Sequence, residues 1–303
     1  MRSLLDIRVG TLVGGGSDTA EKIKALIPLG FESFGITFWQ TLGDTDLARL
    51  ADGAREALAG SDAVISSLGI FGNPLETGET DLKTLRSWEQ AIDHAGDFGC
   101  SLVAGFTGRL RGRSIPESVP RFTEVWGRLA DRAAAKGVRL AFENCSMGGD
   151  WKSGDWNLAH GPDAWELLFD ALPAGHLGLE WEPAHQMVRL CDPLPQLDDW
   201  ASRIFHIHGK DATVDRARID RYGIGASRAW SWHRTPGFGD SNWTDIISKL
   251  RMNGFRGSID IEGWHDPVYR EELEYTGQVH ALNHLKRCRG GERHISLRPP
   301  AQS

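Results

Sequence analysis

The segment FTEVWGRLADRAAAKGVRLAFE, residues 122–143, contains the unit from which the fold is predicted. One face of its first part carries apolar residues at the i, i+3, i+4, i+7 spacing of an amphipathic helix, namely Phe122, Val125, Trp126, Leu129 and Ala133. Gly137 then follows, in the position where glycine commonly ends a helix. The next residues, VRLAFE, have the length and apolar content of a buried strand.

The same order of helix, glycine and strand recurs along the chain. It is found before the segments FESFGITF (31–38), CSLVAG (100–105), HLGLEWE (176–182) and RGSIDIE (256–262). The segments RVGTLV (8–13), DAVISSLG (62–69) and RIFHIHG (203–209) bring the predicted strands to about eight. Alternating strands and helices predict a parallel sheet covered by helices, and about eight such units favour closure into a (β/α)8 TIM barrel, an α/β fold.

The length of 303 residues fits one barrel, since this fold takes about 250 residues before insertions. No Ser- or Pro-rich linker divides the chain, so a single domain is expected over residues 1–303, with the barrel at about 5–285. An insertion is expected between strands seven and eight, at about 211–242, and a C-terminal tail at about 288–303. The insertion contains two tryptophans, Trp230 and Trp232, and is interpreted as covering the site or contacting a second subunit of a homo-oligomer.

Composition and charge exclude several functional classes. The net charge of −7 offers no basic field for a phosphate backbone, so nucleic acid is not expected as a partner. No apolar run approaches the ~18 residues of a membrane span, and Asp6 and Arg8 argue against a signal peptide. The four cysteines are widely spaced and form no CxxC pair, which is typical of reduced thiols in a cytoplasmic protein.

Polar residues end four consecutive predicted strands. Strand five ends in Glu143, strand six in Glu182 and strand eight in Glu262, while strand seven places His206 and His208 on one face. Each residue alone has an ordinary structural interpretation, and His206 is expected to be a packed, hydrogen-bonded residue one layer deeper than His208. In a TIM barrel, however, the carboxyl ends of the strands meet at one rim, where the active site is found.

Carboxylates crowded at that rim would repel one another and raise each other's pKa values unless a cation lay between them. Three carboxylates and one imidazole suit Mn²⁺, Mg²⁺, Co²⁺ or Zn²⁺, and the oxygen-rich set favours a labile, roughly octahedral ion with positions open to substrate. The sequence therefore predicts one divalent metal ion at this rim.

The order of five motifs also resembles a known family. The segments LAFEN, EPAH, HIHGKD, PGFGD and IDIEGW occur in the order seen in xylose-isomerase-like sugar phosphate isomerases and epimerases, and the resemblance spans about residues 5–285. It implies a metal ion, commonly Mn²⁺, held by Glu143, Glu182, His208 and Glu262. It also implies that Glu143 and Glu262 act as the catalytic acid and base on a bound sugar.

Two positions depart from that family's pattern. Glu182 stands where the family's D-P-x-H motif has an aspartate, and it is one methylene longer. Gly149 stands where ketose 3-epimerases carry a second glutamate six residues after the strand-five ligand, which argues against that particular activity.

Further residues are candidates for binding the substrate. His185 follows Glu182 by three residues and is placed to bond a substrate hydroxyl or to orient the metal ligands. Lys210 is expected either in a rim salt bridge with Asp211 or on an anionic substrate group. Trp39 ends strand two and is the candidate wall on which a sugar stacks, whereas Trp181 is expected to pack against helices. The resemblance suggests that Arg234 or its neighbour His233, both in the insertion, supplies a substrate-anchoring cation.

The leading functional interpretation is a divalent-metal-dependent isomerase or epimerase of a sugar or keto-sugar, working by proton transfer through an enediolate. A lyase or dehydratase acting on a keto-polyol or keto-glycoside would share the metal and the first proton abstraction, so the strand motifs do not separate the two. An endonuclease-IV-like DNA repair enzyme is a remote alternative, because it needs more His and Asp ligands and a basic groove.

Overall fold

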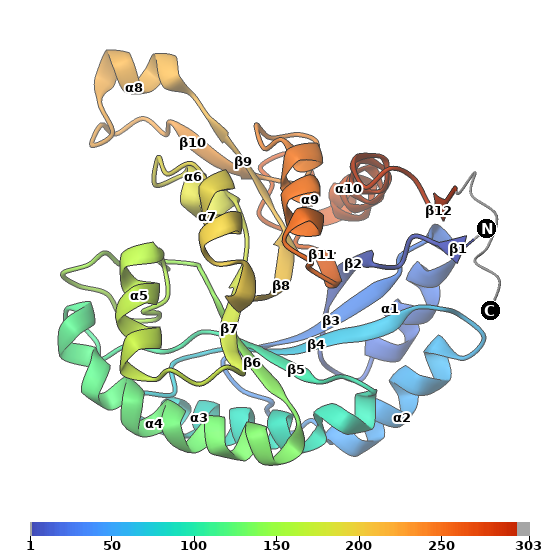
Figure 1. Cartoon of the computed structure of the whole chain (residues 1–303), viewed down its shortest axis with the longest axis horizontal. Helices are drawn as coiled ribbons and strands as arrows, with labels where there is room; N and C mark the ends of the chain where they lie inside the picture. The colour runs from blue at the N-terminus through green and yellow to red at the C-terminus, as the bar shows by residue number, and fades with distance from the viewer. Residues whose placement is uncertain (1, 296–303) are drawn as a thin grey trace.

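The computed structural model describes residues 2–295, and its centre is a closed barrel of parallel strands (Figure 1). The strands lie side by side in the order β11-β2-β3-β4-β5-β6-β7-β8, and β8 closes the barrel by pairing with β11. Their bounds are β2 Ile7–Gly14, β3 Ser33–Trp39, β4 Val64–Phe71, β5 Leu102–Gly105, β6 Arg139–Glu143, β7 Leu177–Trp181, β8 Ile204–Gly209 and β11 Gly257–Ile261. The prediction of a (β/α)8 TIM barrel is confirmed.

Helices surround the strands on the outside of the barrel (Figure 1). Apart from α8 (Arg216–Tyr222), which lies in the segment at 211–242, the α-helices are α1 Thr19–Leu26, α2 Leu47–Leu58, α3 Glu79–His94, α4 Ile115–Lys136, α5 Pro162–Ala171, α6 Ala184–Met187, α7 Leu194–Asp199, α9 Trp243–Met252 and α10 Glu274–Cys288. Short 3-10 helices are η1 Ile27–Leu29, η2 Ala95–Phe98, η3 Ala201–Arg203 and η4 Glu271–Leu273. No described helix is both long and apolar enough to cross a lipid bilayer.

The unit quoted from residues 122–143 folds as its pattern predicts. All five residues of the apolar face of α4 are buried, and the Trp126 ring packs edge-on against Phe142 of β6 at 4.6 Å between ring centroids. The Trp126 indole N–H donates to the Thr107 carbonyl at 2.8 Å, so its one polar atom is satisfied. Gly137 ends the helix with φ 68°, a left-handed conformation that glycine adopts without a Cβ clash. This packing fixes where β6 ends, and therefore where its last residue, Glu143, lies.

The segment at 211–242 projects away from the barrel as an arm between β8 and α9 (Figure 1). It contains β9 (Asp211–Val214), α8 (Arg216–Tyr222) and β10 (Ser231–Arg234), with β9 and β10 paired antiparallel. At the other end of the chain, β12 (Arg293–His294) pairs with β1 (Arg2–Ser3), so the first part of the expected tail returns to the N-terminus. The remainder of that tail, 296–303, lies outside the described residues.

His160, in the loop before α5, should make stability depend on pH. Its side chain is fully buried, and within residues 2–295 neither ring nitrogen has a hydrogen-bond partner. Burial, followed by the positive charges of Arg189 and Arg109, lowers the His160 pKa to about 4. In the unfolded chain the His160 imidazole therefore takes up a proton below pH ~6.5, whereas in the folded chain it stays neutral down to about pH 4. The free energy of unfolding consequently falls as the pH drops through this window.

The expected loss at the acid end of the window is about 3 kcal/mol in the free energy of unfolding. Urea unfolding at a series of pH values from 7.5 to 4.5 measures it. In a His160→Gln variant the decline should be shallower than in wild type, whereas replacement of the exposed His294 by Gln should leave the decline unchanged. A His160→Gln curve parallel to wild type would contradict a neutral His160.

Candidate metal and active site

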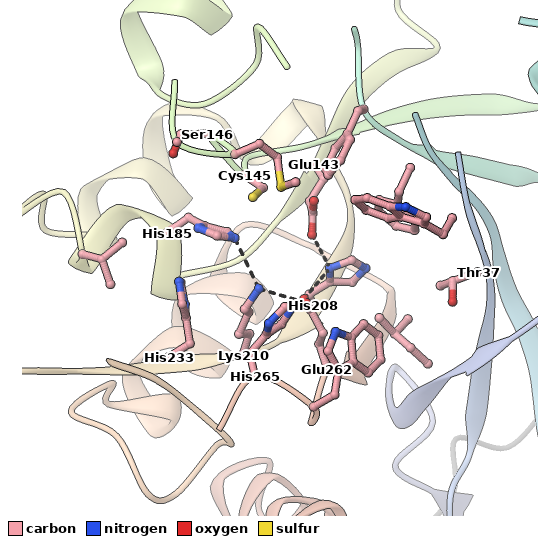
Figure 2. A pocket seen from close by; sticks show the side chains of 18 of the residues that line it. Thr37, Glu143, Cys145, Ser146, His185, His208, Lys210, His233, Glu262 and His265 are labelled. Carbon is pink, nitrogen blue, oxygen red and sulfur yellow. Dashed lines mark hydrogen bonds and ion pairs between the residues drawn. The ribbon is translucent and has the colours of Figure 1, made fainter. Parts of the chain in front are cut away.

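Three of the four predicted metal ligands meet at the carboxyl end of the barrel (Figure 2). Glu143 is the last residue of β6, His208 lies near the end of β8, and Glu262 directly follows β11. His208 Nδ1 lies 3.0 Å from Glu143 Oε1 and 3.3 Å from Glu262 Oε2. All three side chains are buried, and their ligand atoms lie within 4.8 Å of one another, which is close enough to bind one ion.

Glu182 is close by but does not join this group of three. It follows the last residue of β7, and Pro183 and α6 begin directly after it, so its carboxylate is directed towards the start of that helix. Glu182 Oε1 lies 2.9 Å from His185 Nε2, although the two are not aligned for a hydrogen bond. The structure thus connects Glu182 to the site through His185 and does not place it against His208.

Unpartnered polar atoms in the site suit a divalent cation. Within the described residues, both oxygens of Glu182 and Oε2 of Glu262 are buried and have no hydrogen-bond partner. Leaving a buried carboxylate oxygen without a donor is costly, and a cation satisfies it. With the His208 imidazole beside Glu143 and Glu262, and the Glu182 carboxylate close by, the donor set matches the nitrogen and oxygen ligands that Mn²⁺ and similar ions take in proteins.

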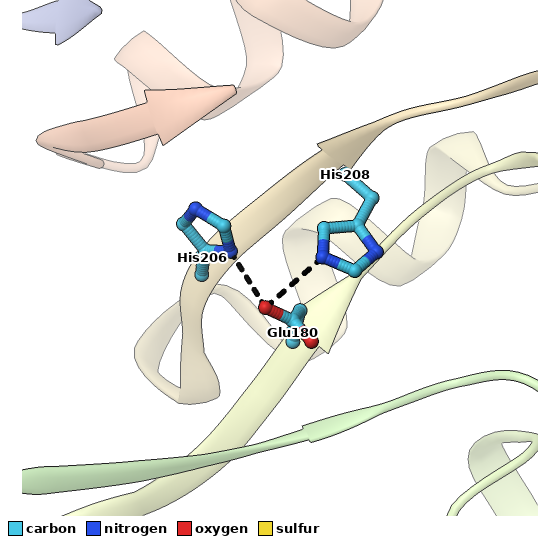
Figure 3. Close-up of side chains that lie close together, drawn as sticks. All are labelled: Glu180, His206 and His208. Atoms are coloured by element: carbon cyan, nitrogen blue, oxygen red, sulfur yellow. Dashed lines mark hydrogen bonds and ion pairs between the residues drawn. The ribbon is translucent and has the colours of Figure 1, made fainter. Parts of the chain in front are cut away.

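Glu180 is a member of the site whose role the sequence did not predict (Figure 3). Its Oε1 lies 2.8 Å from His206 Nδ1 and 3.1 Å from His208 Nε2, so one carboxylate lies between the two imidazoles. Burial alone would raise the Glu180 pKa, but the two histidines outweigh it and lower the pKa to about 2. A carboxylate against one ring nitrogen of a histidine fixes the orientation of the ring, and Glu180 holds this position against His208, a predicted ligand.

His206 occupies the deeper layer, as its sequence position suggested. Its Nε2 lies 2.8 Å from Asp260 Oδ2 and its Nδ1 lies against Glu180, with all three side chains at most 1% exposed. Glu180 is paired with His206 in the β7–β8 register, after a bulge between Leu179 and Glu180. The alternation of side chains along the strand already places Glu180 on the inner face of the barrel. Its contact with the two histidines depends on this strand register, which the sequence does not show.

Lys210 is buried inside the site, and the expected rim salt bridge with Asp211 is not formed. Lys210 Nζ lies 2.9 Å from Glu262 Oε1 and 3.3 Å from His185 Nε2. Asp211 instead accepts from the Ser241 N–H at 3.0 Å and from the Trp243 indole at 3.2 Å. The reason is that neighbouring residues of an extended segment direct their side chains to opposite sides.

The two cavity carboxylates have pKa values shifted in opposite directions. Burial raises the pKa of Glu143, and the adjacent His208 offsets this only in part. Burial would also raise the pKa of Glu262, but Lys210, His208 and His265 together outweigh it and hold that pKa well below its usual value. Burial, with the charge of Lys210, lowers the pKa of His185, which is therefore a neutral imidazole near neutral pH.

A cavity of about 590 Å³ opens above these residues. His185 and Lys210 line it, as does Trp39, whose side chain remains 60% exposed. Arg234 does not line the cavity. Its Nε donates to Asp266 Oδ2 at 3.0 Å, while its neighbour His233 lines the cavity instead. Trp181 is fully buried and donates to Gln196 at 3.0 Å, in the packed position that was expected.

Gly149 lies in the loop after β6, and a side chain there, such as the second glutamate of the 3-epimerases, would be tightly packed. A Cβ there would lie 3.2 Å from Arg109 Nη1, from the Gly154 Cα and from the Ser146 carbonyl. Arg109 is fully buried and donates to the Asp150 carbonyl at 2.7 Å, which holds this loop in place. Among the described residues lining the cavity, the acidic ones are Glu143 and Glu262.

Comparison with known proteins agrees with the fold. The family model described as "Xylose isomerase-like TIM barrel" matches residues 23–288. The chain belongs to this family. The uncharacterised protein YfiH of Bacillus subtilis, a relative of this xylose isomerase-like barrel, is 24% identical over 259 residues, which cover 75% of this chain and 79% of YfiH.

Two proteins with named activities are also similar to this xylose isomerase-like barrel. Inosose dehydratase of Lacticaseibacillus casei is 28% identical over 181 residues, or 55% of this chain, and the matched part spans only 57% of the dehydratase. The crystal structure of the E. coli 3-keto-D-glucoside 4-epimerase YcjR matches with a TM-score of 0.69 at 16% identity, covering 93% of this chain and 100% of that one. The second likeness is one of fold.

Proposed function

We propose that this chain is a divalent-metal-dependent enzyme that isomerises or epimerises a sugar or keto-sugar by moving a proton beside its carbonyl group. The observation that carries the proposal is the pair of buried carboxylates, Glu143 and Glu262, which flank His208 with pKa values shifted in opposite directions. Two titratable groups with separated pKa values are the usual arrangement of an acid and a base in one site.

Glu143, Glu182, His208 and Glu262 are the residues that would hold the metal ion, with Mn²⁺ favoured by the oxygen-rich donor set. When bound, the ion supplies Lewis acidity, which stabilises negative charge on substrate oxygens. The two unpartnered oxygens of Glu182 support its inclusion, although its carboxylate lies against His185.

The side chains divide the proton transfer between them. Glu262 is ionised beside Lys210 and takes the proton from the carbon next to the carbonyl. Glu143, on the other side of His208, returns a proton to the opposite face of the same carbon in an epimerisation, or to the neighbouring carbon in an isomerisation, in which the hydroxyl proton also moves to the former carbonyl oxygen. Lys210 donates to a substrate oxygen, and the neutral His185 bonds a hydroxyl.

A lyase or dehydratase is the second candidate. It is supported by the similarity to inosose dehydratase and by Gly149, which leaves the cavity without the further carboxylate of the 3-epimerases. In that reaction Glu262 would remove the same proton, and the substrate would then expel a β-hydroxyl or β-alkoxyl group, which Glu143 would protonate as it leaves.

Hydrogen exchange in D₂O tests the proposal and separates the candidates. The Mn²⁺-loaded protein is incubated with ketoses, keto-inositols and 3-keto-glycosides, and the products are followed by NMR. We expect solvent deuterium on the carbon beside the carbonyl, in the epimer or isomer and in recovered substrate. An unsaturated or cleaved product would identify the lyase, and an isomerised product that kept its own hydrogen would contradict proton transfer to Glu262.

A further inference from the structure

We infer that the cavity has a second compartment that takes a flat, apolar aglycone, so that the substrate is a keto-glycoside of an aromatic alcohol. This inference rests on the proposed function and names its substrate class. The compartment is the wall formed by Phe71, Phe106 and Trp39, which is called the aromatic wall below. It begins beside the metal ligands, since the Phe71 ring centroid lies 6.2 Å from that of His208.

The aromatic wall continues outward from Phe71 through edge-to-face contacts. The Phe71 and Phe106 centroids lie 5.3 Å apart at 82°, and those of Phe106 and Trp39 lie 6.5 Å apart at 85°. Behind it, the Trp156 ring lies 5.5 Å from Trp39. The rings thus support one another, and the wall reaches from the ligand His208 to the open end of the cavity.

The opposite side of the cavity has a different chemistry. His185, His233, His265 and Lys210 gather there, and Figure 2 shows them away from Thr37. Thr37 precedes Trp39 by two residues in β3 and therefore lies on the same face of that strand. Hydroxyl and carbonyl groups of a sugar find donors and acceptors on the imidazole side. A second sugar on the wall side would leave most of its hydroxyls unpaired, because phenylalanine rings offer no hydrogen bonds, and burying an unpaired hydroxyl is unfavourable.

The backbone holds Trp39 in its exposed position. Gln40, the next residue, has φ 61°, a left-handed conformation that is uncommon for residues other than glycine, and its N–H donates to the Phe71 carbonyl at 3.1 Å. An indole that is 60% exposed at the mouth of a cavity has apolar surface available for a ligand. The cavity volume of about 590 Å³ lies within the range of about 300–1,000 Å³ found for drug-sized ligands.

Binding measurements without turnover test the inference. Calorimetry on the Mn²⁺-loaded protein compares phenyl with methyl D-glucosides, D-galactosides and D-mannosides in both anomeric forms, together with cellobiose and maltose. For at least one sugar the phenyl glycoside should bind about tenfold more tightly than the methyl glycoside, which corresponds to ~1.4 kcal/mol, within the range of aromatic contacts with their buried area. The disaccharides should bind no better than the methyl glycosides.

Two variants assign the preference to the aromatic wall. Trp39→Ala should reduce the phenyl-to-methyl ratio to about one, while Trp151→Ala, which replaces a half-exposed tryptophan that does not line the cavity, should keep it. Equal weakening of both glycosides by Trp39→Ala would make the wall a sugar subsite and overturn the inference. So would tight disaccharide binding, or no phenyl preference in the whole panel, whether or not the methyl glycosides bind.

The outcomes separate this inference from the proposed function. A phenyl preference without hydrogen exchange on any keto-sugar would leave the aglycone compartment standing and would remove the proton-transfer proposal. Hydrogen exchange on free ketoses without a phenyl preference would support the proton-transfer proposal and would remove the aglycone compartment.

Discussion

Replacing Glu262 with Gln in the metal-loaded protein should lower turnover by about 10²-fold or more, which is the usual loss when a general acid or base is removed. The glutamine keeps the size of the side chain and an oxygen that can face the metal, but it cannot take up a proton. Lys210 would lose the carboxylate that lies 2.9 Å away, so part of the decrease would appear as weaker substrate positioning. Rates of deuterium uptake and of product formation measure the effect.

Metal content has to be measured in the same samples, because an empty site would imitate the loss of the base. Glu56→Gln, on the exposed side of α2, is the matched control for a lost glutamate charge and should keep full activity. Undiminished turnover by Glu262→Gln with a full complement of metal would show that another group removes the proton.

Replacing His206 with Ala should have the largest effect on stability, about 3–5 kcal/mol in the free energy of unfolding. The substitution leaves the carboxylates of Glu180 and Asp260 buried without the imidazole between them. His208→Ala removes a predicted ligand, so it should abolish metal binding, whereas His206→Ala should retain it. Urea unfolding of the metal-free proteins and metal analysis after reloading measure the two effects. Metal kept by His208→Ala and lost by His206→Ala would reverse the roles assigned to the two histidines.

The barrel was predictable because its signals are local and repeated. The apolar face of α4, the glycine after it and the short apolar strand recur with little variation, and each depends on backbone geometry that the sequence expresses directly. Glu143, His208 and Glu262 came together for the same reason, since the ends of parallel strands in a barrel meet at one rim.

The residues that were misplaced depend on side-chain direction or on register. Of the two roles expected for Lys210, the salt bridge with Asp211 is not formed, because adjacent residues of an extended chain face opposite sides, and Lys210 Nζ pairs with Glu262 instead. The same alternation in β10 directs His233 into the cavity and leaves Arg234 with Asp266.

Glu180 and Glu182 show a second limit of the sequence. Alternation places both side chains on the same face of one segment, but their contacts differ. The bulge in the β7–β8 pairing sets Glu180 against the two histidines, and the start of α6 directs Glu182 towards His185. No short-range pattern encodes a pairing register between strands that are about 25 residues apart in the chain.

Metal analysis of protein purified without chelator tests the central claim most directly. The account predicts about one divalent ion per chain, removed by EDTA with a fall in thermal stability, since a ligand that binds only the folded state stabilises it. Single Ala variants of Glu143, Glu182, His208 and Glu262 should each reduce the bound metal in Mn²⁺ titrations, and Glu56→Gln should not. A wild-type protein that binds no divalent ion at millimolar concentration, or metal binding that survives loss of His208, would contradict the site.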